Sequence, residues 1–405
     1  MKYGGKTYQE INIDAFVHEI STFRMFQLAI QILFAIIALI SQNTLTFFVA
    51  LSILPYNMFI GFKTIFQAVG DFDQYSKASN ISTIMLFLVN MCAVFVFRTD
   101  SSIVYVCSYL ICYILIWIIL ELRIKSLTEI HFKDYFKLDV YNLIDNIRAG
   151  ILLMLGNFSS IILTGMDRWF IKFLMNTVAF AQYSFAVSIE NFINFAVTPI
   201  STTLYNYFCR ETTAYQINHI RNLVMIFSAF LITAAFPAKF ILEVYLTKYI
   251  AATDVILYLF IGQFFFIQVK SIHVNLYKAQ KRQRSYFIKL SFIVALGAVL
   301  NSVLYMLLNS KEAFAIGTML TAVVWFMWSN FDFPEIKLNI QEYLYISIIP
   351  SLFLFCGHIP YAIVGGILYI ISAILITYLL EKSEFYYIVS YINTLFHKLL
   401  SIQHN

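Results

Sequence analysis

Long stretches without charge recur along the whole chain. Nine of them contain no Asp, Glu, Lys or Arg and cover residues 25–62, 78–97, 101–120, 149–166, 222–238, 255–269, 290–310, 313–331 and 343–380. A tenth stretch, 173–209, carries Glu190 as its single charge. A helix that crosses the hydrocarbon core of a membrane needs about 20 predominantly apolar residues. Most of these stretches therefore predict one membrane-spanning helix each.

The first and last stretches are long enough for two helices. Each contains 38 residues, which as a single helix would be about 57 Å long, against a hydrocarbon core of about 30 Å. Polar or helix-breaking residues lie where each stretch would turn back, at Ser41 to Thr44 and at Gly357 to Pro360. The pattern therefore predicts twelve helices. Strands of a membrane β-barrel would be half as long and would alternate polar with apolar positions, which is not seen.

The composition agrees with this pattern. Apolar residues make up 60% of the 405 residues, aromatic residues 18% and charged residues 12%, whereas soluble domains carry about 25% charge. The mean hydropathy is +0.77. A disordered or fibrous protein is excluded, because the chain is neither solvated nor repetitive enough. An ordinary soluble domain is disfavoured, because too few charges remain to cover its surface. The predicted fold class is an all-α polytopic membrane protein.

The positions of the basic residues predict the orientation. When the 27 Lys and Arg residues are assigned to alternating sides of the twelve helices, 21 fall on the side of the termini and 6 on the other. This asymmetry predicts that both termini lie in the cytoplasm. The net charge of +5 is then a signal of topology, and nucleic-acid binding is disfavoured because the basic residues are divided among loops. The dense run from Lys278 to Arg284 is interpreted as a topology determinant.

Motifs for cofactors are absent from the sequence. The five cysteines form no CxxC pair, the seven histidines form no metal-ligand pair, and no phosphate-binding loop for ATP occurs. Asp71-Phe72-Asp73 matches a metal-binding DxD motif, but it lies in a short loop without a catalytic domain and is interpreted as a chance match. No cofactor and no metal are expected.

A weak internal repeat relates the two halves of the chain. Phe66-Gln67-Ala68 and Tyr75 correspond to Tyr277-Lys278-Ala279 and Tyr286 at an offset of 211, and Tyr8-Gln9 corresponds to Tyr215-Gln216 at an offset of 207. Chance competes with this reading, since each match is short. If it holds, helices one to four match helices seven to ten, and two helices are missing before the first one. Repeated helical lobes are common in transporters.

Three segments carry a family resemblance. They are Leu155–Asn157, Gly165–Ile171 with its Asp-Arg pair, and Ala181–Ala186 with Tyr183-Ser184. Together they resemble the polysaccharide-exporter family that includes the O-antigen flippases, although Ala181-Gln182 stands where that family has Gly. The resemblance implies an incomplete four-span bundle at residues 1–125, a six-helix bundle at 126–330, and a two-helix hairpin with a cytoplasmic tail at 331–405. The family's first two helices would be absent.

The resemblance also implies a function. The chain would be a transporter rather than an enzyme, in the bacterial cytoplasmic (inner) membrane. It would move a lipid-linked oligosaccharide of the undecaprenyl-pyrophosphate type by alternating access, for O-antigen, capsule or another surface polysaccharide. Membrane lipids, a polysaccharide polymerase and a chain-length regulator are the expected partners. Alternatives are a membrane-embedded polymerase or lipid-dependent glycosyltransferase, which would need a larger external loop, and a related multidrug exporter.

Glu190 is the leading candidate for a functional residue. A charge in the middle of a span costs at least about 2.5 kcal/mol and usually faces a cavity or a partner. Asn194 follows one helical turn later on the same face, and Asn191 flanks it. These residues predict either the wall of a hydrated cavity, with Glu190 as a proton-coupling group, or a structural carboxylate bonded to a neighbouring helix.

Two other pairs of residues are weaker candidates. Asp167 and Arg168 are expected at the outer end of the fifth span, as a local ion pair, an interface anchor, or a gate that contacts phosphate. Lys63 and Arg24 lie near the ends of the second and first spans. They are expected either to reach the lipid headgroups or to attract the pyrophosphate of a lipid carrier.

Overall fold

The fold was analysed in a computed structural model that describes residues 13–96, 98, 101–128, 138–210 and 212–403. These residues form helices and no strands, which confirms the all-α class. The chain divides into two compact units, residues 1–151 and 152–405, and the division falls within one long helix, α5 (Val140–Leu174).

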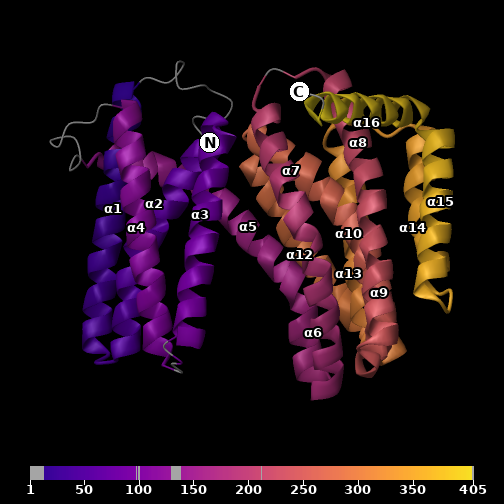
Figure 1. The fold of residues 1–405 in the computed structure, drawn as a ribbon, viewed down its shortest axis with the longest axis horizontal. Coiled ribbons are helices and arrows are strands. Elements are labelled where there is room, and N and C mark those ends of the chain that lie inside the picture. Colours follow the sequence, from indigo (N-terminus) through magenta and orange to yellow (C-terminus); the bar gives the residue numbers. More distant parts are fainter. Residues whose placement is uncertain (1–12, 97, 99–100, 129–137, 211, 404–405) are drawn as a thin grey trace. The chain divides into compact units, whose positions relative to one another are not determined.

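The first unit contains four long helices that run alongside one another (Figure 1). They are α1 (Ile13–Ile40), α2 (Thr44–Val69), α3 (Phe72–Met91), which continues as the π-helical turn η2 (Cys92–Val96), and α4 (Ser102–Thr128). A core of Phe16, Phe62, Phe66, Ile116 and Leu120 joins α1, α2 and α4. The predicted turn between α1 and α2 is confirmed.

Local capping explains where these helices end. The Asn43 side chain accepts hydrogen bonds from the backbone N–H groups of Leu45 and Thr46, so it caps α2. At the other end of α2, Gly70 has a φ of 82° and its N–H returns to the carbonyl of Gln67, a left-handed C-cap that favours glycine. Asp71 then caps α3 through the N–H of Gln74.

The second unit begins with the later part of α5 and contains the remaining helices. The long ones are α6 (Thr177–Asn191), α7 (Ile193–Phe208), α8 (Ala214–Leu231), α9 (Ala235–Val244), α10 (Thr253–Gln268), α12 (Gln283–Leu308), α13 (Glu312–Phe331), α14 (Ile340–Gly357), α15 (Ala362–Leu380) and α16 (Lys382–Gln403). Short segments link them: η4 (Ile232–Ala234), η5 (Thr247–Ala252), η6 (Val269–His273), α11 (Val274–Ala279) and η7 (Pro334–Ile336).

Helix α10 is the centre of the second unit. It packs against α6, α8, α9, α13 and α14, and residues Val255 to Leu257 and Leu259 to Gln268 are all buried. Close approach is possible because Gly262 has no side chain: a Cβ atom there would lie 3.5 Å from Cα of Met319 in α13. An apolar helix with no polar face is expected at such a position.

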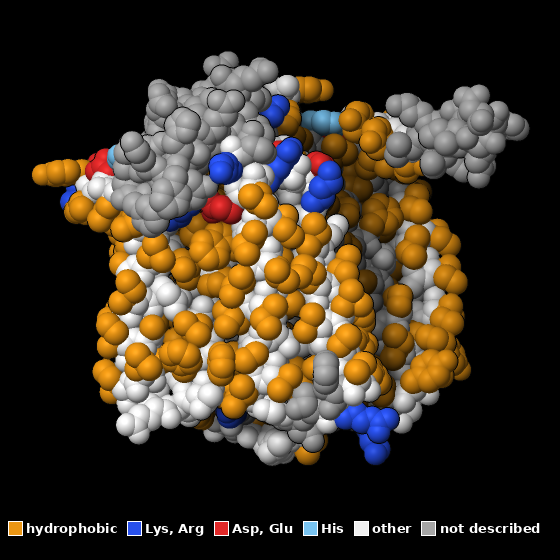
Figure 2. All heavy atoms as spheres, turned by 60° about the vertical axis from the view of Figure 1, so that its left-hand side comes forward, with side chains coloured by type: hydrophobic (Ala, Val, Ile, Leu, Met, Phe, Trp, Pro, Cys, Tyr) orange, Lys and Arg blue, Asp and Glu red, His pale blue; other side chains and the backbone are white. Residues whose placement is uncertain are grey.

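The outer surface confirms a membrane protein. Apolar side chains on the helices are exposed, among them Ile32, Ile36, Phe87, Phe158 and Met306. Figure 2 shows hydrophobic side chains across the middle of the visible face, with charged side chains at its upper and lower edges. In the described part of the chain, eleven helices, some continuing through a short 3-10 or π segment, are long and apolar enough to span a membrane. Such helices satisfy their backbone hydrogen bonds internally, as hydrocarbon requires.

The expected single span at 173–209 has a different structure. It consists of two helices, α6 and α7, which are interrupted at Phe192 and are each too short to count among the eleven. The last helix, α16, also stands apart, because it lies across the ends of the other helices of its unit (Figure 1). The predicted reversal at Gly357 to Pro360 is confirmed. There, buried Lys239 of α9 donates to the carbonyl oxygens of Gly357 and Ile359 at 2.8 and 2.6 Å.

Tight packing of α14 on α15 gives a test of this arrangement. A Cβ atom on Gly365 would meet the carbonyl oxygen of Cys356 in the α14 backbone. We expect Gly365→Ala to lower the melting temperature of the detergent-solubilised protein, because overpacking costs about 1–3 kcal/mol. Gly150 has no described atom within 4 Å of its Cβ position. Gly150→Ala is therefore the control and should leave the melting temperature unchanged or raise it; equal effects of the two changes would contradict the packing.

Candidate functional site

A polar cavity lies inside the second unit. Its volume is about 80 Å³, and its walls come from α5, α6, α7, α10, η6 and α13. The lining residues are Thr164, Asp167, Val187, Glu190, Asn191, Asn194, Gln263, Phe266, Lys270 and Thr318. Four of them, Asp167, Glu190, Asn191 and Asn194, are residues that the sequence predicted.

Glu190 enters the cavity where the helix is interrupted. Helix α6 ends at Asn191 and α7 begins at Ile193, and the N–H of Phe192 bonds to the carbonyl of Ile189 in a tighter turn. Across this break the side chain of Asn194 donates to that of Asn191 at 3.1 Å. Asparagine side chains compete with the backbone for hydrogen bonds and favour helix ends. The break therefore brings the predicted polar residues to one place.

The Glu190 carboxylate has a partner on the central helix. Only 7% of Glu190 is exposed, and its Oε1 accepts a hydrogen bond of 2.5 Å from the amide of Gln263 in α10. A buried carboxylate without a partner would be very costly. This contact fits the prediction of a carboxylate bonded to a neighbouring helix, and the cavity beside it fits the prediction of a polar wall.

Asp167 lies deeper than the sequence indicated. Helix α5 continues beyond it to Leu174, so Asp167 and Arg168 lie within the helix and not at its end. Asp167 is 2% exposed and accepts hydrogen bonds from the hydroxyl of Tyr183, at 2.6 Å, and from the backbone N–H of Arg168, at 2.7 Å. Neither bond uses the Arg168 guanidinium, and Arg168 is half-buried outside the cavity lining. Asp167 is thus part of the buried polar wall.

Lys270 is the charged residue of the cavity lining that the sequence analysis did not single out. The sequence pattern ends the uncharged stretch at Val269 and leaves Lys270 outside it, but Lys270 lies in the π-helical segment η6, inside the continuous helical stretch Thr247–Ala279. Its Nζ is 5.3 Å from the ring centroid of Phe266. A signal was present: the stretch 255–269 has only 15 residues, too few to cross a hydrocarbon core. Extending it to full length would have placed Lys270 inside.

The cavity combines groups with complementary chemistry. Two carboxylates, those of Asp167 and Glu190, face one ammonium, that of Lys270, together with amide and hydroxyl groups. Such a set can hold water, a small cation or an exchangeable proton. Within the described residues, no group of three His, Cys, Asp or Glu could hold a metal ion.

The remaining two candidates, Arg24 and Lys63, belong to the first unit. Arg24 is 5% exposed and forms an ion pair with Glu121 of α4, so the expectation that it reaches the headgroups is wrong. Lys63 is half-buried, with its Nζ 5.3 Å from the ring centroids of both Phe59 and Tyr75. Both cations therefore contribute to packing between helices.

Gln27 and Gln31, which follow Arg24 along α1, also contribute to packing between helices. Gln27 accepts a hydrogen bond of 2.8 Å from Asn57 of α2. The Gln31 amide inserts into the backbone of α2: it donates to the carbonyl of Ala50 and accepts from the N–H of Leu54, both at 3.0 Å. Pro55 follows directly and lacks an N–H. An inserted side chain and a proline are the usual causes of a distorted helix.

Comparisons with known proteins bear on the fold. No protein-family model matches the sequence, and no curated protein matches it either. Among solved structures, the fold is similar to that of the lipid II flippase MurJ in an inward closed conformation. The TM-score is 0.53 and the sequence identity 13%, and the match covers 93% of this chain and 86% of the other. At this identity the likeness concerns the fold, and it agrees with a multi-pass membrane protein.

The charges in the cavity predict a coupled effect on stability. Removing the Glu190 carboxylate takes a negative charge away from the Lys270 ammonium, and removing the ammonium takes a positive charge away from the carboxylate. Each single change therefore leaves one charge less well balanced. We expect Glu190→Gln and Lys270→Met together to destabilise the protein by at least about 0.5 kcal/mol less than the sum of the single changes. The measurement is a double-mutant cycle of unfolding in detergent. The control pair is Glu190→Gln with Lys63→Met, which should be additive; additivity in both pairs would contradict the coupling.

Proposed function

We propose that this protein is a flippase that moves a lipid-linked oligosaccharide across the bacterial cytoplasmic membrane by alternating access. The observation that carries the proposal is a buried cavity with charged walls, in a chain whose fold is similar over 93% of its length to a lipid II flippase. The residues that resemble polysaccharide exporters support an oligosaccharide on an undecaprenyl-pyrophosphate-type carrier, used for O-antigen, capsule or another surface polysaccharide.

The size of the cavity decides its role in this proposal. Pockets that enclose a small organic ligand have about 300–1,000 Å³, whereas this one has about 80 Å³. An oligosaccharide with a pyrophosphate cannot fit there. The cavity is therefore the site of the coupling ion, and Glu190 is the group that takes up and releases a proton. Asn191, Asn194 and Gln263 hold water or the carboxylate in place.

Irregular helical segments make movement at this site possible. The interruption at Phe192 and the π-helical segment η6 both border the cavity, and Pro199 follows in α7. Such segments bend more easily than regular helix. A change of charge on Glu190 would alter its bond to Gln263, which links α6 to α10. Protonation could thus bias the unit between two arrangements, as alternating access requires.

Orientation and partners follow from the same proposal. Both termini lie in the cytoplasm, and the protein performs no chemical reaction on its substrate. A polysaccharide polymerase and a chain-length regulator act on the oligosaccharide after it reaches the outer face. Arg168, Arg24 and Lys63 are not needed at the cavity, and in this proposal Arg24 and Lys63 stabilise the first unit.

Complementation tests the proposed substrate class. Cells that lack the flippase of a surface-polysaccharide pathway would receive this chain. We expect polysaccharide to reappear at the cell surface and the lipid-linked unit to stop accumulating at the inner leaflet, as measured by glycan staining and lipid extraction. Accumulation despite good membrane expression would contradict the proposal. Drug resistance without surface polysaccharide would favour a multidrug exporter.

The coupling role of Glu190 has its own test. In vesicles containing the purified protein, we expect transport of a lipid-linked oligosaccharide to depend on an imposed pH gradient. Glu190→Gln keeps the shape of the side chain and an oxygen to which Gln263 can donate, but it cannot titrate. The dependence of transport on the pH gradient should therefore disappear. The transport rate should fall at least about tenfold, which corresponds to about 1.4 kcal/mol. Glu312→Gln at the start of α13, outside the cavity, is the control. Undiminished transport by the Glu190 variant at every pH would remove the coupling role.

A further inference from the structure

A second and larger cavity lies at one end of the second unit. Its volume is about 390 Å³, within the range of pockets that enclose small organic ligands. It lies between the first turns of α8 and α14 and the corner that joins α15 to α16. The residues around it are Tyr215, Asn218, His219, Asn222, Asn339, Gln341 and the segment from Leu379 to Glu384.

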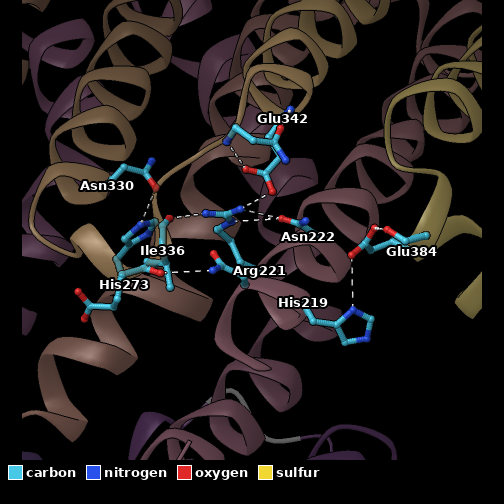
Figure 3. A network of polar contacts seen from close by, with 12 residues as sticks. His219, Arg221, Asn222, His273, Asn330, Ile336, Glu342 and Glu384 are labelled. Carbon is cyan, nitrogen blue, oxygen red and sulfur yellow. Dashed lines mark hydrogen bonds and ion pairs between the residues drawn. The ribbon is translucent and has the colours of Figure 1, made fainter. Parts of the chain in front are cut away.

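A rigid polar network borders this cavity. Arg221, 1% exposed, forms an ion pair of 2.5 Å with Glu342 and donates to Asn222 and to the carbonyl of Ile336. Figure 3 shows these groups converging on the guanidinium. Asn339 and Glu342 also form a reciprocal cap at the start of α14. Since these charges have partners within the network, none of them requires a ligand.

The cavity itself has hydrogen-bond acceptors without donors. Glu381 is 4% exposed, and its Oε1 has no hydrogen-bond partner among the described residues. The same is true of Oδ1 of Asn218, although its Nδ2 donates to the carbonyl of Glu335. A buried polar atom left without a bond costs about 1–3 kcal/mol. Because both residues line this cavity, a ligand that supplies donors would satisfy acceptors that the described chain leaves unpaired.

The carboxylates around the cavity also favour a ligand that supplies donors. Burial, together with repulsion from Glu342 and Glu384, raises the pKa of Glu381 to about 7, although Arg221 opposes the shift. Glu384 is 8% exposed and lies 3.5 Å from Nδ1 of His219, as Figure 3 shows. A bound cation would relieve the repulsion between the carboxylates. The ligand should thus carry positive charge as well as donors.

The cavity lies where lipid headgroups are found. Spans α8 and α14 begin there and α15 ends there. Helix α16 lies across the helix ends (Figure 1) and exposes Tyr386, Tyr387, Tyr391 and Ile392. Tyrosine is enriched at membrane interfaces, and helices with an aromatic or apolar face lie in them. A headgroup can therefore reach the cavity while its acyl chains stay in the membrane.

We propose that this cavity binds the headgroup of an aminophospholipid. Its primary ammonium donates to Glu381, Glu384 and the carbonyl of Asn218, and exposed Lys382 at the edge of the cavity attracts the phosphate. An ammonium has three N–H donors, which match these acceptors. A bare metal ion would leave most of the volume unfilled, and an anionic lipid would be repelled by the two carboxylates. The proposal is independent of the transported substrate.

Lipid retention tests the site in the complete chain. The protein would be extracted from membranes with equal amounts of phosphatidylethanolamine and phosphatidylglycerol, and the retained lipid measured by mass spectrometry. We expect phosphatidylethanolamine to be enriched, and Glu381→Gln with Glu384→Gln to reduce the enrichment about tenfold, since charge-assisted bonds are lost. Glu335 is an exposed carboxylate outside the cavity, so Glu335→Gln is the control and should leave the phosphatidylethanolamine enrichment unchanged. No enrichment, or no change in the double variant, would overturn the proposal.

One further lipid and one soluble amine separate the possible sources of the ammonium group without any substitution. Phosphatidylcholine has the same charge but no ammonium N–H, so it should be retained at least about fivefold less than phosphatidylethanolamine. Soluble phosphoethanolamine, added to protein in phosphatidylglycerol bilayers, should not raise the melting temperature, whereas phosphatidylethanolamine should. Equal retention of the two lipids would overturn ammonium recognition. Equal stabilisation by the soluble amine would overturn the membrane source.

Discussion

Hydrocarbon offers no hydrogen-bond partner, and this constraint governs which polar groups the chain can carry inside its spans. Three buried charges of the described helices have a compensating group on another element: Arg24 has Glu121, Arg221 has Glu342, and Glu190 has Gln263. Lys239 instead uses the free carbonyls at the end of α14. Breaking such a pair costs more than the pair contributes, because the remaining charge stays buried.

The same constraint explains why the irregular helices lie where they do. An interruption such as that at Phe192 frees backbone groups, which can be tolerated only inside the protein or beside water. It occurs beside the cavity, and so does the π-helical segment η6. Segments of this kind often mark functional sites. The cavity therefore combines the two features that a moving, proton-exchanging element needs.

Much of the fold could be predicted from the distribution of charge. Stretches without charge located the spans, and short polar segments located the turns before Thr44 and after Gly357, because both signals depend on local sequence. Glu190 could be selected for the same reason. Its partner Gln263 could not, since contact between α6 and α10 depends on tertiary packing. Lys270 was missed because a basic residue at the end of a short apolar stretch resembles one in a loop.

Residues with long side chains show a second limit of prediction from the sequence. Arg24 and Lys63 were expected either to reach the headgroups or to attract a pyrophosphate. Arg24 instead turns inward to Glu121 of a distant helix, and Lys63 lies over two aromatic rings. Sequence spacing gives the face of a helix but not the partner on the next one. Polar residues that lie on one face, such as Gln27 and Gln31, can therefore serve helix packing as readily as transport.

The two cavities of the second unit illustrate how size and compensation separate their roles. The smaller one is lined by two carboxylates and Lys270 and is too small for an organic ligand, so we propose an exchangeable proton as its occupant. The larger one lies at the ends of the spans, and two residues that line it have acceptors without a partner among the described residues, which supports the proposed donor from outside the chain. Neither can enclose an oligosaccharide with its carrier. The glycan of the proposed transport must therefore pass along other surfaces, with the small cavity acting on it through helix movement.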